Sequence, residues 1–191
     1  MLNCDYTDKT QHQFYSTCCE QDENVNVVGL YPENKIENLL SCFPTNSWTQ
    51  FFISEIVDIP CKKPDVEGVV SVHSDITIIS QRVIKTPVVT KNGFPDYNTT
   101  NSECTKLTGR KLIIEGILRQ KIVYTAAVDE QSLHSAHFSI PFSVFIIIPQ
   151  DTPLSQNFKI DSIIEDVFTC RLSERSIFKN TTIFIKATPV C

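Results

Sequence analysis

The chain has 191 residues, of which 41% are hydrophobic and 20% are charged, and this composition is typical of a globular domain with its own core. Its formal net charge of −5, without any cluster of Lys and Arg, excludes the usual electrostatic footprint of a nucleic-acid partner. No run of about 18 apolar residues occurs, so we expect no membrane-spanning helix. The first residues also lack the basic and apolar regions of a secretory signal peptide.

The N-terminal part of the chain is predicted to be an extended arm that includes a short helix. Residues 1–25 are polar and show no periodicity, whereas residues 26–30 predict one short strand. A helix is expected between Pro32 and Pro44, because four apolar side chains recur on one helical face: Ile36, Leu39, Leu40 and Phe43. We therefore expect residues 1–47 to form a cysteine-bearing arm.

The segment after the arm leads into a region with the two-residue period of β-strands. Trp48 to Pro64 is amphipathic and ends in a turn. From residue 68 onward, apolar side chains alternate with polar ones, and those sharing one face are Val70, Val72, Ile76 and Ile78. Residues 81–90 are predicted to be a partner strand. Residues 91–109, which contain an Asn-Gly pair, predict a long loop.

The second half of the chain predicts further strands with the same period. The ranges are 111–127, 133–148, 158–172 and 176–187. In the first of these, Leu112, Ile114, Leu118, Ile122 and Tyr124 are predicted to share one face. The second range is one strand, or two strands broken at Pro141. The predicted fold class is therefore mainly β: an antiparallel β-sandwich over residues 48–191, preceded by a short N-terminal helix and an extended N-terminal arm.

Two motifs in this β-rich region carry a resemblance to a known family. Residues 59–67 read Ile-Pro-x-x-Lys-Pro-Asp-x-Glu, and residues 134–142 read His-x-Ala-His-Phe-x-Ile-Pro-Phe. With the strands around them, over about residues 48–189, they resemble the SPOCS domain of spore-forming Firmicutes, which occurs in sporulation proteins and beside LysM modules. The resemblance implies a β-rich fold and a place in the spore envelope, and it supplies no catalytic residues.

The chain also differs from the SPOCS pattern in its cysteine-bearing arm, its cysteine content and its lack of a LysM module. These features resemble cysteine-rich proteins of the exosporium or of spore appendages. Such proteins are made in the mother-cell cytoplasm without a signal peptide and meet oxidising conditions later. That history reconciles eight cysteines with the predicted absence of an export signal.

The positions of the cysteines predict links between subunits. Adjacent cysteines rarely bond each other, so Cys18 and Cys19 are expected to reach different partners. The candidates for intermolecular disulfides lie in the arm, in the long loop and at the chain ends, and are Cys4, Cys18, Cys19, Cys104 and Cys191. The less certain cysteines are Cys42, Cys61 and Cys170. Of these, Cys170 shares strand parity with Phe168 and is expected in the core.

Metal binding and catalysis find little support in the residues. There is no C-x-x-C pair, and His134 and His137 are three residues apart, which places them on opposite faces of a strand. Asp65 and Glu67 are interpreted as turn formers. The glycosylation acceptor pattern at Asn98 is interpreted as chance, and so is the one in the last strand. No catalytic motif occurs, so no metal, cofactor or catalytic residue is predicted.

The sequence predicts a structural, self-assembling protein of the spore outer layer, exosporium or coat, cross-linked by intermolecular disulfides into an ordered lattice or fibre. Its partners would be further copies of itself and other spore-surface proteins, with no nucleic acid and no membrane. The alternative is a SPOCS-like binding module that anchors another spore-envelope component. A third hypothesis, an enzyme with a Cys nucleophile, requires one thiol that reacts far faster than the rest.

Overall fold

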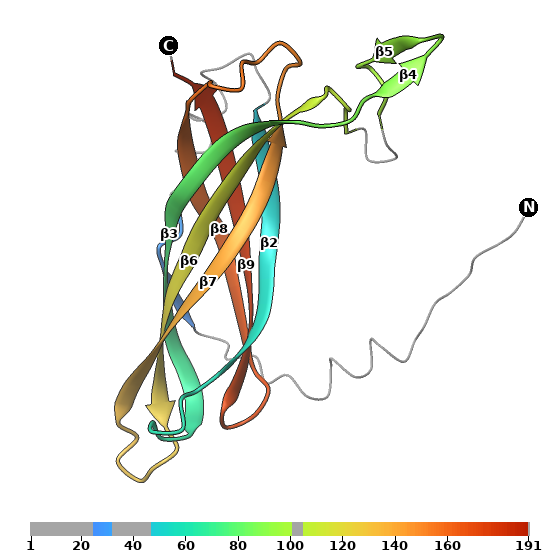
Figure 1. Ribbon diagram of the computed structural model, residues 1–191. Helices are drawn as coiled ribbons and strands as arrows, with labels where there is room; N and C mark the ends of the chain where they lie inside the picture. The colour runs from blue at the N-terminus through green and yellow to red at the C-terminus, as the bar shows by residue number, and fades with distance from the viewer. Residues whose placement is uncertain (1–24, 32–46, 101–104, 191) are drawn as a thin grey trace, which may run out of the picture.

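Two stacked sheets and one small hairpin make up residues 25–31, 47–100 and 105–190, which the computed structural model describes (Figure 1). The first sheet has the order β1-β3-β6-β7, with bounds Asn26–Val28, Val66–Lys85, Arg110–Ala126 and Leu133–Ile147. The second sheet has the order β2-β9-β8, with bounds Trp48–Asp58, Ser176–Pro189 and Phe158–Arg171. The hairpin pairs β4 with β5, and their bounds are Val89–Lys91 and Phe94–Asp96.

Every strand pair is antiparallel except β1 with β3, so the prediction of a mainly β, antiparallel sandwich is confirmed. No helix occurs within the described ranges. The helix predicted between Pro32 and Pro44 lies outside them. The proposed division at residue 48 stays a prediction, although β1, which comes from the predicted arm, pairs with β3 of the first sheet.

The core lies between the two sheets and follows the predicted alternation in β6. In β3, Val70 was predicted to share a face with Val72, but it is exposed while Val72 is buried, because the register shifts between Val69 and Ser71. Even-numbered residues of β6 point inward, and Leu112, Ile114, Leu118, Ile122 and Tyr124 are fully buried. Odd-numbered residues of β9 meet them from the opposite sheet, among them Ile177, Ile183 and Ile185. The apolar face predicted for residues 111–127 is therefore confirmed, because period-two patterning places one set of side chains on one face of a strand.

The first long strand differs from its prediction. Residues 68–78 and 81–90 were expected to be two paired strands, but β3 runs through Lys85 without a turn and pairs with β6 along its whole length. The register shifts between Ile78 and Ser80. Such a bulge inserts one extra residue into the strand. Even-numbered side chains point inward before it and odd-numbered ones after it, so the alternation of apolar residues in the sequence is interrupted as it would be at the end of a strand. After it, Val83 is again buried.

β7 is a single strand in spite of Pro141. In the described residues β7 pairs only with β6, so it is an edge strand of its sheet. An edge strand tolerates proline, because the missing N–H removes no ladder bond on the open side.

β1 acts as a strap between the two sheets. Val27 pairs in parallel with Val72 of β3. Farther along the chain, Leu30 and Tyr31 reach Ile164 of β8, where the Tyr31 N–H donates to the Ile164 carbonyl at 3.2 Å. Gly29 makes the crossing possible. Its φ is +108°, and a Cβ there would lie 2.2 Å from the Ser74 carbonyl oxygen. The strand predicted over residues 26–30 is thus confirmed.

The β4–β5 hairpin projects from one end of the sandwich (Figure 1). The expected Asn-Gly pair forms its tip, where Asn92 has a φ of 52° and Gly93 a φ of 81°. Positive φ at both central residues is typical of the type I′ turn of two-residue hairpins. The range predicted as a loop therefore contains an ordered hairpin.

Candidate functional site

The outward face of β2 exposes a row of large apolar side chains, which we call the β2 stripe: Trp48, Phe52 and Ile56. Phe52 is 70% exposed and Ile56 is 61% exposed. β2 pairs only with β9 within the described residues, so it is an edge strand of the second sheet. Its inward side chains, including Val57, pack in the core. An apolar row on an edge strand is a typical association surface.

A second exposed apolar surface lies on the projecting hairpin. Phe94, next to the Asn92-Gly93 tip, is 76% exposed, and Val89 on the paired strand is also exposed. The hairpin is held by Asp96, whose carboxylate lies 2.7 Å from Lys91 Nζ and accepts a hydrogen bond from Thr99 Oγ1 at 2.9 Å. This hairpin therefore presents an apolar tip away from the sandwich.

The cysteines lie mostly outside the described residues. This is true of Cys4, Cys18, Cys19, Cys42, Cys104 and Cys191, so their predicted roles stay predictions. Cys170 is buried, as expected of a core residue, and it is not a free thiol. Cys61, which ranked among the less certain cysteines, is free and exposed in the turn between β2 and β3. Its position makes it a further candidate for a link between subunits.

The turn that carries the first resemblance motif is held by Arg175, from the connection between β8 and β9. Its guanidinium pairs with Asp65 and donates to the carbonyls of Ile59, Pro60 and Lys63 at 3.2, 2.9 and 3.2 Å. The prediction that Asp65 forms a turn is consistent with this contact. One guanidinium satisfying several backbone acceptors fixes the turn, and the motif therefore has a structural role here.

A buried polar cluster lies between the sheets, and sequence reasoning missed it. Lys179 of β9 is fully buried, and its Nζ lies 2.6 Å from Glu55 Oε1 and donates to Gln120 Oε1. Gln120 Nε2 donates to Ser74 Oγ and Thr181 Oγ1, both at 3.0 Å. Burial lowers the pKa of Lys179, while Glu55 acts in the opposite direction.

The alternation of residues along two strands could have predicted this cluster. Lys179 has the same parity as Ile177 and Ile183, which are fully buried. Glu55 likewise has the parity of Val57 and Ile53, which point into the core. A charge on the apolar face of each of two strands that pair with one another indicates a buried ion pair.

The histidines lie apart, as their spacing predicted. His134 is beside the Tyr124 ring, with 6.0 Å between ring centroids, and His137 lies on the exposed outer face of β7. Within the described ranges no group of three or more His, Cys, Asp or Glu side chains is placed to hold a metal ion. In the same part of the chain, no helix has the length and apolarity to cross a membrane.

Comparison with family models matches residues 65–171 to the SipL, SPOCS domain family, which is more than half of the chain. The match lies inside the range of the resemblance seen in the sequence. Comparison with curated proteins found no match, and comparison with solved structures found none either. Membership in this family associates the chain with spore formation. From its two motifs, its sandwich of long strands and this match, the chain belongs to the SipL family and contains its SPOCS domain.

Proposed function

We propose that this chain is a structural subunit of the spore outer layer, exosporium or coat, that associates with copies of itself. The β2 stripe is the observation that carries the proposal, because Phe52 and Ile56 leave large apolar areas in solvent on a sheet edge. Covering such a row with another subunit removes apolar surface from water at about 25 cal/mol per Å². In this proposal the chain is not an enzyme.

The projecting hairpin supports a head-to-tail contact. Phe94 at its tip and the β2 stripe are both apolar and belong to different strands of the molecule, so the hairpin of one copy can cover the stripe of the next. A contact between two different surfaces repeats from subunit to subunit and builds a ring, a fibre or a lattice, depending on closure. Disulfides would then fix the assembly, with exposed Cys61 joining the five cysteines predicted from the sequence.

The test uses the full chain, with and without reductant. After boiling in detergent, gel electrophoresis is expected to show ladders that collapse to a monomer only with reductant, and negative-stain microscopy is expected to show ordered particles. The variant Phe52→Ser/Ile56→Ser and, separately, Phe94→Ser are expected to lose the ordered particles. Ile79→Ser is the matched control, because Ile79 on β3 is as exposed as Ile56, at 61%, and lies outside both surfaces.

The outcomes separate the hypotheses. Loss of particles in the β2 stripe and Phe94 variants, with Ile79→Ser unchanged, supports head-to-tail assembly. A chain that runs as a monomer both with and without reductant, and that forms no ordered particles, contradicts head-to-tail assembly. The alternative, a module that anchors another spore-envelope component, then takes its place. A single thiol labelled far faster than the others would instead favour the Cys-nucleophile enzyme.

A further inference from the structure

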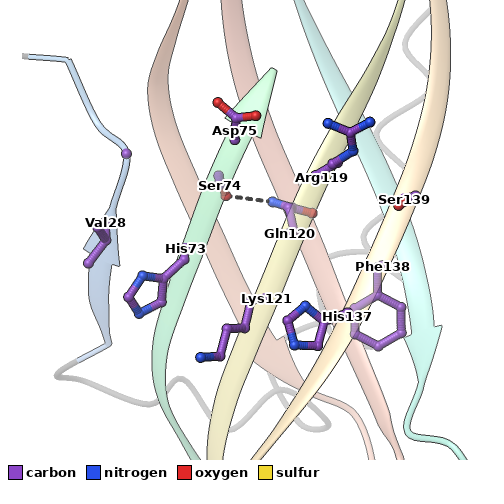
Figure 2. A pocket seen from close by; sticks show the side chains of 11 residues that line it. Val28, His73, Ser74, Asp75, Arg119, Gln120, Lys121, His137, Phe138 and Ser139 are labelled. Atoms are coloured by element: carbon purple, nitrogen blue, oxygen red, sulfur yellow. Dashed lines mark hydrogen bonds between the residues drawn. The ribbon is translucent and has the colours of Figure 1, made fainter. Parts of the chain in front are cut away.

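The outer face of the first sheet holds a pocket of about 310 Å³ whose lining is rich in basic groups (Figure 2). His73 of β3, Lys121 of β6 and His137 of β7 line it, together with Arg119. All four side chains are exposed. Of the described residues that line the pocket, Asp75 is the one acid. The chain carries a net charge of −5, so this concentration of basic groups runs against the overall charge.

The register of the sheet places three of these groups in one row. His73 is the partner of Lys121, and Lys121 is the partner of His137, so the three side chains lie on adjacent strands (Figure 2). Adjacent strands are about 4.8 Å apart, which makes the row about 10 Å long. Neither Lys121 nor His137 forms an ion pair within the described residues. Their donors therefore face solvent.

The next row along the strands adds a second cation. Arg119 and Asp75 are register partners, and Arg119 donates one hydrogen bond, from Nη1 to Thr77 Oγ1 at 2.9 Å. The other guanidinium N–H groups remain for a ligand. Val28 of β1 and Gly29, which follows it, close the side of the pocket, because β1 passes beside His73.

We propose that this pocket binds a polyvalent oxyanion, a molecule with two or more carboxylate or phosphate groups, across β3, β6 and β7. Lys and Arg donate charge-assisted hydrogen bonds to such oxygens, and a protonated imidazole does the same. A row about 10 Å long accommodates more than one charged group, since each strand contributes one donor about 4.8 Å from the next. Asp75 opposes this binding by its negative charge, whereas Lys121 and Arg119 support it.

The test is a titration of the full, reduced chain with citrate and, separately, with pyrophosphate, followed by amide NMR shifts and calorimetry. Shifts are expected at residues 73, 119–121 and 137. Lys121→Gln is expected to weaken binding by about tenfold or more, as for loss of a hydrogen bond to a charged group. Lys111→Gln is the matched control, because Lys111 is on the outer face of the same strand but contacts Phe145 outside the pocket. The two probes distinguish carboxylate from phosphate ligands.

Two further variants keep the test independent of folding and of assembly. Asp75→Asn removes the opposing acid and is expected to tighten binding, a direction that a folding defect does not produce. His73→Gln/His137→Gln is expected to weaken binding, because it removes two of the three basic groups in the row across β3, β6 and β7. Equal weakening by Lys121→Gln and Lys111→Gln, or no shifts at these residues with either probe, would overturn the inference. Neither result bears on self-assembly, which depends on the β2 stripe and on Phe94.

Discussion

Two lysine–carboxylate pairs of nearly equal length lie in opposite surroundings in this protein. Lys179 Nζ is 2.6 Å from Glu55 and fully buried between the sheets, whereas Lys91 Nζ is 2.7 Å from Asp96 and 70% exposed on the projecting hairpin. In water the attraction between such charges is weak and screened, and in the interior it must offset a large desolvation cost. The comparison teaches that the surroundings of an ion pair, more than its length, set how much the fold depends on it.

The largest expected effect comes from removing one charge of the buried pair. Glu55→Gln keeps the shape of the side chain but leaves the Lys179 ammonium in the core without its counter-ion. We expect a loss of about 3 kcal/mol in the free energy of unfolding, measured by urea denaturation. The control is Asp161→Asn, which breaks the solvent-exposed pair with Lys159 and is expected to cost at most about 1 kcal/mol. Equal losses in the two variants would refute the comparison.

The second prediction removes both buried charges together. In Glu55→Leu/Lys179→Met no uncompensated charge remains, and apolar replacements of buried ion pairs are often neutral or stabilising. We expect most of the stability lost in Glu55→Gln to return. A deficit of about 1 kcal/mol should remain, because Gln120 Oε1 loses its donor. If the double variant is less stable than Glu55→Gln in urea, the buried ion pair makes a net favourable contribution to stability and the prediction is wrong.

The third prediction concerns the pH dependence of stability. Because burial lowers the pKa of Lys179 in the folded state, the unfolded chain binds more protons between that lowered pKa and the ordinary value of 10.5. Stability should therefore rise with pH across this window. The measurement is the difference in unfolding free energy between the natural chain and Glu55→Leu/Lys179→Met as a function of pH. A difference that stays flat contradicts the lowered pKa.

The smallest effect is expected at the hairpin. The hydrogen bond from Lys91, followed by those from the Asn98 amide and the Thr99 hydroxyl, lowers the pKa of Asp96 to about 2. The contribution of this carboxylate is present above its ordinary value of 3.8 and is lost as the pH falls through about 2. Side-chain NMR should find the midpoint near 2, and Lys91→Ala should raise it. Global unfolding should be unchanged in that variant, because the pair is exposed.

The sequence predicts the strands correctly where the same set of alternate residues, odd or even, faces the core throughout. It fails where a bulge changes which set faces the core. β6 alternates without a break from Leu112 to Tyr124, and its buried face was predicted residue by residue. β3 contains bulges, so its second half reads as a separate strand although it is continuous. The local pattern of apolar residues shows which side chains share a face. The length of β3, in contrast, depends on its pairing with β6, which is distant in the sequence.

The candidate surfaces were less accessible to prediction than the fold. The apolar side chains of β2 are visible in the sequence, but whether Phe52 or Phe51 faces solvent depends on which face meets the opposite sheet. The row of His73, Lys121 and His137 depends on the registers of two strand pairs. Register is fixed by long-range pairing, so no short segment of the sequence contains it.

The β1 strap has a mechanical consequence. Tension on the chain before Asn26 pulls β1 along its own axis, and its parallel pairing with Ser71, Val72 and His73 means that these contacts resist in shear together. Beyond Gly29 the chain reaches Ile164 of β8, so the load passes from the edge strand β1 into both sheets. A pull on the chain before β1 would therefore be shared between the two sheets.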